Sequence, residues 1–376
     1  MRMEKETPLL FENSYVNEDD IWFSAMDFNG LFKANLLTGQ VQFMGCFPKE
    51  SSLKRRLHFG KTICVDECLY FIPWGSSHLH VYDMREQCFF AYEIEGEAQH
   101  KYSSAIEAND AVYFFPAEAE KVLKFSYKTK QIEYLDPNGA SRDLQKIYRY
   151  QLNVMREDEY VFFSLKNDNV VMMFHADTET FRLVRVGDAK ERFLILAKKD
   201  NIVYLKVLNQ PEIVLWNYMT EREERRVWVR DGIENNSWIF GDKILGNNWK
   251  YKGIQIVDLN TMQEQNGKWH EEVLEYHFVL EIMNAFVYGE KLYYVWSGDG
   301  AIYSADTQER CWQFLLTEKL KQRVKGEMQF AEESIVYEES NFFGLEDYIE
   351  YVKNYSPKEA NAVEQNVGKT ICDMLL

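Results

Sequence analysis

Short runs of apolar and aromatic residues recur along the chain at a nearly constant spacing. Each run is bounded by polar turn residues, which is typical of short strands that are buried on both faces. Successive runs start 41 to 49 residues apart, at Ile21, Leu69, Val112, Val161, Val203, Ile244 and Leu292. The pattern therefore predicts a repeating unit of about 45 residues.

A polar turn follows each run about ten residues later. In most copies a short polar side chain is followed three residues on by Thr, as in Asn35 with Thr38 and Asp258 with Thr261. Such side chains bond to backbone two or three residues ahead and stabilise a tight turn. A further apolar run lies on either side of this pair of strands, so we expect four strands in each unit.

Four-stranded units of this length are typical of β-propellers, in which the blades are arranged radially. The strand–Asp–turn–Thr strings at 81–87 (VYDMREQ) and 257–263 (VDLNTMQ) resemble those of generic seven-bladed propeller repeat proteins. The resemblance covers residues 9–318 and implies an all-β, seven-bladed β-propeller of four-stranded antiparallel blades. It identifies no functional subfamily, because propellers have many activities. The alternative is a sandwich built from unrelated hairpins.

We expect three parts in the chain: the propeller at 1–318, a linker and candidate closing hairpin at 319–340, and a short α-helical tail at 341–376. Residues 318–326 are charged and fit a linker or a short helix. Residues 327–337 are expected to pair with the N-terminal strand and close the ring, because open sheet edges promote aggregation. The tail helices are expected to pack on the propeller; the alternative is a partner-binding or oligomerisation segment.

Composition excludes several classes of protein. With 46% hydrophobic and 15% aromatic residues, the chain is too apolar to be disordered. A net charge of −17 argues against a nucleic-acid partner. No apolar run is long enough for a membrane span, and the N-terminus lacks the apolar core of a secretory signal, so we expect a cytoplasmic location. The six scattered cysteines fit reduced thiols.

Candidate ligand contacts lie in the loops before the first strand of each unit. In a four-stranded meander these loops share one face, here called the channel face, with the loops between strands two and three. Basic–aromatic pairs precede five of the runs: His58-Phe59, Lys101-Tyr102, Arg149-Tyr150, Arg192-Phe193 and His277-Phe278. A basic ring in an acidic protein would attract an anion, which guanidinium groups can bind bidentately. The alternative is that the aromatics are core residues and the bases are solvated.

Tryptophans occur in the loops between strands two and three, at Trp74, Trp249 and Trp296. Flat aromatic faces beside polar groups suit sugar rings. The alternative is that Trp74 and Trp296 only cap the packing of the blades. The acidic turns before the apolar runs are expected on the opposite face.

The predicted ligand-binding residues are therefore His58, Lys101, Tyr102, Arg149, Tyr150, Arg192, Trp74, Trp249, Trp296 and His277. No catalytic residue can be assigned. His78 and His80 alternate along a strand but have no third ligand at a clear spacing, so neither a metal nor a cofactor is expected. We expect a non-enzymatic propeller that binds an anionic or sugar-containing ligand, or a protein partner, on its channel face. The alternative is a carbohydrate lyase or hydrolase that uses the same face.

Overall fold

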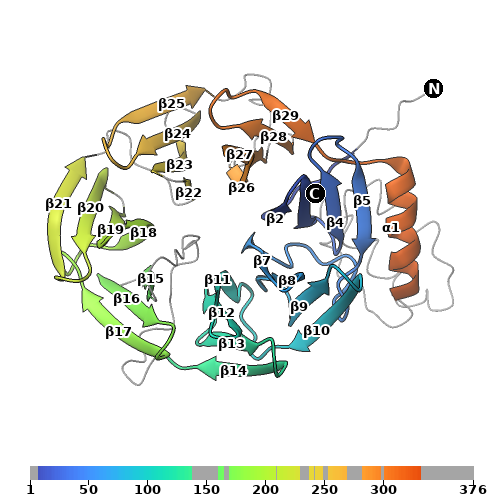
Figure 1. Ribbon diagram of the computed structural model, residues 1–376, viewed down its shortest axis with the longest axis horizontal. Coiled ribbons are helices and arrows are strands. Elements are labelled where there is room, and N and C mark those ends of the chain that lie inside the picture. Colours follow the sequence, from blue (N-terminus) through green and yellow to red (C-terminus); the bar gives the residue numbers. More distant parts are fainter. Residues whose placement is uncertain are drawn as a thin grey trace, which may run out of the picture.

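The computed structural model shows a β-propeller, in which antiparallel sheets are arranged around a central axis (Figure 1). It describes residues 7–137, 160–164, 169–208, 210–228, 237–240, 242–248, 253–268, 282–297 and 300–331. Neighbouring strands of each blade are consecutive in the chain, so each blade is a meander that runs from the channel outward.

The first blade contains β2 (Asn13–Asn17), β3 (Asp20–Ser24), β4 (Leu31–Asn35) and β5 (Val41–Gly45), and β6 (Gly60–Lys61) pairs with β2 in parallel. The second contains β7 (Ile63–Val65), β8 (Cys68–Phe71), β9 (His78–Asp83) and β10 (Cys88–Glu93). The third contains β11 (Tyr102–Ala108), β12 (Ala111–Pro116), β13 (Val122–Ser126) and β14 (Gln131–Leu135).

The next sheet contains β15 (Tyr160–Ser164), β16 (Val170–His175) and β17 (Thr180–Arg185). It is followed by the blade of β18 (Phe193–Lys199), β19 (Ile202–Val207), β20 (Glu212–Asn217) and β21 (Arg222–Trp228). Another contains β22 (Ser237–Phe240), β23 (Lys243–Asn248), β24 (Gly253–Asp258) and β25 (Glu264–Lys268). The last contains β26 (Ile282–Tyr288), β27 (Lys291–Trp296), β28 (Ala301–Ser304) and β29 (Arg310–Gln313).

The all-β propeller with four-stranded antiparallel blades is confirmed, but the prediction of seven such blades is corrected to six. The remaining sheet, β15–β17, shows three strands. The fourth strand expected in this unit would precede β15, where residues 138–159 lie outside the described residues.

The predicted turn chemistry is present in the structure. Asn35 Oδ1 accepts hydrogen bonds from the backbone N–H groups of Leu37 (3.2 Å) and Thr38 (2.9 Å). Asp258 does the same in its own blade, with Asn260 (3.0 Å) and Thr261 (2.8 Å). The polar–x–x–Thr repeat thus marks the hairpin between the two outer strands of a blade.

The apolar runs lack alternation because each inner strand contacts two neighbouring blades. In β3, Ile21 and Phe23 pack with residues of the last blade, including Tyr293. Trp22, on the other face of the same strand, packs with Leu69 of the second blade. A strand between two apolar interfaces has no solvent face on which polar residues would be favoured.

The ring closes between the first and last blades. β1 (Thr7–Pro8) pairs antiparallel with β30 (Leu315–Leu316), and Asn284 Nδ2 donates to Ser14 Oγ at 2.8 Å. A strand pair that ends before residue 317 thus joins the two ends of the propeller. Residues 332–337 of the segment that was expected to close the ring lie outside the described residues.

A helix, α1 (Glu318–Ala331), follows β30 and lies against the outer strand β5 of the first blade (Figure 1). Leu320 and Val324 are one turn apart, and Val324 is fully buried in the core of that blade. Residues 327–331, where a hairpin was expected, are thus helical. The expected tail helices at 341–376 lie outside the described residues. No helix in the described ranges has the length and hydropathy of a membrane span.

Candidate functional site

The channel-face loops of the first three blades contact one another closely. Residues 46–59, which join β5 to β6, run alongside the β8–β9 loop. The N–H of Trp74 donates to the Leu57 carbonyl at 2.9 Å, and that of Gly75 to the Arg56 carbonyl at 3.1 Å. A Cβ at position 75 would lie 2.8 Å from the Arg56 carbonyl oxygen, so this approach requires glycine. The loop before β11 contacts the β8–β9 loop as well, because the Lys101 N–H donates to the Trp74 carbonyl at 2.9 Å.

Glu50 is the centre of the polar contacts here, and its side chain is 2% exposed. Its Oε1 accepts hydrogen bonds from the Ser77 N–H (2.5 Å), the Ser77 hydroxyl (2.7 Å) and the Ser76 hydroxyl (3.2 Å). Its Oε2 accepts from Lys54 Nζ at 2.8 Å. Burial opposes ionisation, but the hydrogen bonds from Lys54 and Ser77 outweigh it and lower the pKa of Glu50 to about 2. Glu50 is therefore a fixed carboxylate whose charge Lys54 balances.

His58 and His80 form a buried pair beneath this carboxylate. His58 Nε2 lies 2.9 Å from His80 Nδ1, and His80 Nε2 lies 3.0 Å from the Pro48 carbonyl oxygen. A carbonyl only accepts, so His80 Nε2 carries a hydrogen, and His58 Nε2 donates to the free lone pair of His80 Nδ1. Burial lowers the pKa of His80 to about 4 and that of His58 well below its usual value. Both imidazoles are neutral, and they hold the 46–59 loop onto the second blade.

Lys101 is buried, with 7% of its surface exposed. Burial lowers the pKa of its ammonium, the charge of Lys54 lowers it further, and the charge of Glu50 opposes the shift. Among the described residues, no side chain forms an ion pair with the Lys101 ammonium, since Glu50 is engaged by Lys54 and the two serines. Lys101 therefore brings an unbalanced positive charge to the channel face.

The predicted aromatic contacts that are described are buried in packing. The Trp74 ring lies between Phe59 (4.6 Å between centroids) and His100 (4.7 Å). Tyr102 belongs to the core between the second and third blades, and Trp296 to the core beside the last blade. None of the three offers an open ring face to a sugar.

The other bases of the channel face are largely engaged. Arg55 pairs with Asp27, and Arg56 with Glu12. Arg192 lies some distance along the ring, before β18, and its guanidinium donates to the carbonyls of Ala189 (2.8 Å) and Glu191 (2.6 Å). The remaining predicted contacts, Arg149, Tyr150, Trp249 and His277, lie outside the described residues. Of the predicted set, the structure thus brings together His58, Trp74, Lys101 and Tyr102.

Sequence reasoning missed Glu50, Lys54 and the two serines. One signal was available, the Ser76-Ser77-His78 string in a predicted channel-face loop. Glu50 carried none, because the chain contains 60 acidic residues and its partners Ser76 and His78 lie 26 and 28 positions away.

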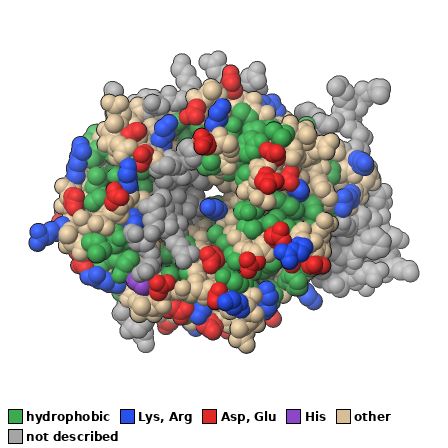
Figure 2. All heavy atoms as spheres, viewed as in Figure 1, with side chains coloured by type: hydrophobic (Ala, Val, Ile, Leu, Met, Phe, Trp, Pro, Cys, Tyr) green, Lys and Arg blue, Asp and Glu red, His purple; other side chains and the backbone are tan. Residues whose placement is uncertain are grey.

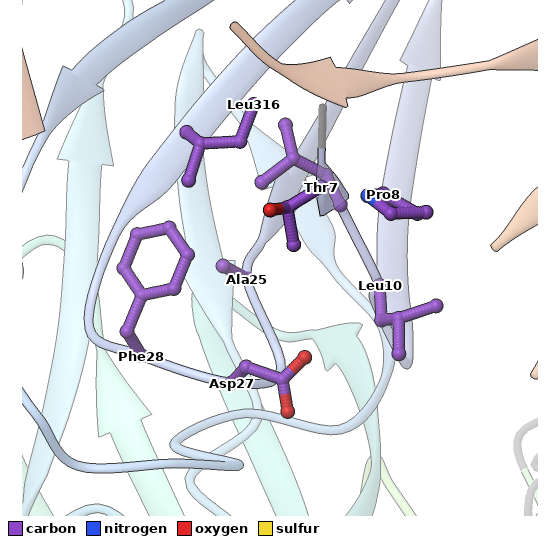
Figure 3. Close-up of a pocket in the computed structure, with 8 residues that line it drawn as sticks. Thr7, Pro8, Leu10, Ala25, Asp27, Phe28 and Leu316 are labelled. Carbon is purple, nitrogen blue, oxygen red and sulfur yellow. The ribbon is translucent and has the colours of Figure 1, made fainter. Parts of the chain in front are cut away.

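A small recess lies at the joint between the first and last blades (Figure 3). Its lining residues include Leu10, Phe28, Leu316 and Asp27, and its volume of about 10 Å³ suits roughly one water molecule.

Figure 2 shows acidic and basic side chains around the ring on the face in view, with a Lys or Arg side chain at the central opening. Within the described ranges, no group of three or more His, Cys, Asp or Glu residues is arranged to hold a metal ion.

Comparison with known proteins supports the architecture alone. No family model matches the chain, and no curated protein sequence matches it either. Among solved structures it is similar to virginiamycin B lyase from Staphylococcus aureus, with 9% identity over 78% of this chain and 96% of that one and a TM-score of 0.58.

Two further similar structures are an extracellular domain and a chain of an assembly. The first is that of a putative one-component system from B. thetaiotaomicron, with 12% identity over 78% of this chain and 38% of that one and a TM-score of 0.54. The second is a chain of the mitotic checkpoint complex, with 11% identity over 80% and 91% and a TM-score of 0.53. At these identities the likeness shows a β-propeller fold that unrelated functions share.

Proposed function

We propose that this protein is a binding propeller that holds an anionic ligand on its channel face, beside the first three blades. The observation that carries the proposal is Lys101, a residue only 7% exposed whose ammonium has no carboxylate partner in the described part of the chain. A buried charge is costly unless it is paired. A bound anion would supply the missing partner, because Glu50 forms its ion pair with Lys54.

The fold is compatible with this role, since the similar structures include a lyase and the extracellular domain of a one-component system. A protein partner on the same face is the second candidate, because another similar structure is part of a multiprotein complex. A carbohydrate lyase or hydrolase is the enzymatic alternative, and turnover of a uronate-containing saccharide by the purified protein would establish it.

A thermal-shift screen with sugar phosphates and uronic acids tests the proposal. We expect the melting temperature of the wild-type protein to rise with an anion more than with sodium chloride of equal ionic strength, because a ligand that binds only the folded state stabilises it. Lys101→Met should abolish this shift, since it removes the unpaired charge but keeps most of the side-chain volume.

Lys121→Met is the matched control, because Lys121 is exposed on the next channel-face loop. It should retain the full shift. Equal shifts in the two variants, or no anion-specific shift in the wild-type protein, would rule out Lys101 as the anion site.

A further inference from the structure

His78, at the start of β9, is partly exposed beside Glu50, with 18% of its side chain accessible. Its Nδ1 lies 3.0 Å from Ser77 Oγ and 3.4 Å from Glu50 Oε1. No hydrogen bond joins its other nitrogen, Nε2, to another residue in the described part of the chain. His78 therefore has one nitrogen bound within the loop and the second available.

When the His78 imidazole carries one hydrogen, its hydrogen-bond partners determine which nitrogen holds it. The Ser77 hydroxyl has a single hydrogen, which it donates to Glu50 Oε1 at 2.7 Å. Ser77 Oγ must therefore accept from His78 Nδ1, and the ionised Glu50 can only accept as well. Nδ1 carries the hydrogen, so Nε2 presents a lone pair, and a carboxylate that orients an imidazole in this way is a common support for a functional histidine.

We propose that His78 Nε2 accepts a hydrogen bond from a ligand hydroxyl, so that the channel face selects a hydroxylated carboxylate, such as a uronic acid, over other anions. This inference rests on the proposed anion site and names its ligand class. Lys101 supplies one unbalanced positive charge, which matches a singly charged carboxylate better than a phosphate dianion. Glu50 is the common neighbour, because it contacts His78 directly and its charge acts on Lys101.

Calorimetric titration with D-glucuronate, acetate, D-glucose and inorganic phosphate tests the inference. Glucuronate should bind the wild-type protein most tightly, because it has both the carboxylate and the hydroxyls. His78→Asn keeps a polar atom near the Nδ1 position but loses Nε2, so it should weaken glucuronate binding about tenfold, as expected for one lost hydrogen bond, and leave acetate binding unchanged. His78→Gln, which places a polar atom near the Nε2 position, should restore part of the loss.

One measurement needs no variant: the ¹⁵N resonance of His78 Nε2 in the wild-type protein should shift on addition of glucuronate but not of acetate. The inference is overturned if phosphate binds more tightly than glucuronate, if His78→Asn weakens acetate and glucuronate equally, or if the Nε2 resonance does not respond. Those results leave the anion site at Lys101 standing. If no anion binds at all, the proposed function itself fails.

Discussion

At the scale of single residues, the channel face is organised around Glu50. Its two oxygens engage Lys54 and the Ser76–Ser77 pair, so it joins the loop after the first blade to the second blade. Within the described part of the chain, these contacts leave Lys101 without a carboxylate partner and hold His78 by one nitrogen. These are the two groups to which the proposed ligand would bind.

The buried histidines predict a loss of stability in mild acid. His80 has a pKa of about 4 in the folded protein against 6.5 when unfolded, so the unfolded chain binds more protons between these values. Stability should be highest above about pH 6.5 and fall by roughly 2 to 3 kcal/mol as the pH drops towards 4. Urea unfolding from pH 7 to pH 5 measures this slope, above the range in which Glu50 titrates.

The groups that act on the pair are Glu50, Lys54 and His78. His80→Gln is the informative variant, since an amide can still bond the Pro48 carbonyl but does not titrate. Its stability should change less with pH than that of the wild-type protein. A slope as steep as in the wild-type protein would show that other groups cause the acid sensitivity.

At the scale of elements, the hairpins followed from local chemistry, whereas α1 did not. The turn at Asn35 is stabilised by residues two and three positions away, so its sequence alone predicts it. The helix depends on a distant surface, because Val324 packs into the core of the first blade. The sequence of residues 318–326 fits a linker as well as a short helix, and isolated helices of this length are marginal in water.

We therefore expect Val324→Ala to destabilise the protein by about 2 kcal/mol through loss of buried methyl groups and the cavity left behind. Arg323→Ala, at the neighbouring exposed position, should change stability by less than about 0.5 kcal/mol. Chemical unfolding of both variants provides the comparison, and equal stability would indicate that α1 does not contribute to the first blade.

At the scale of the whole molecule, the closed ring depends on the joint between its ends. Gly300, before β28, has a φ of +66° and faces β1: a Cβ there would lie 2.8 Å from Pro8 Cβ and from Leu10 Cδ2. Gly39 has nearly the same φ, +69°, but open space around it. Substitution of each glycine by alanine therefore distinguishes the effect of backbone conformation on stability from the effect of close packing at the joint.

Gly39→Ala should cost about 1 kcal/mol for the left-handed backbone alone. Gly300→Ala should cost about 1 to 3 kcal/mol more, because the added methyl group overpacks the contact with β1. Urea unfolding of the two variants gives the difference. If they are equally stable, the contact between β1 and the last blade has little influence on ring stability.

The amino-acid sequence by itself determined the repeating strands, their turns and the propeller class, because these depend on residues close together in the chain. It also placed His58 and Lys101 in channel-face loops. Only the tertiary structure decided how the ring closes, where α1 packs and which lysine Glu50 neutralises. These outcomes depend on contacts between residues that are distant in the chain, such as Ser14 with Asn284. They also depend on burial, which distinguishes the Glu50 carboxylate from the many exposed ones.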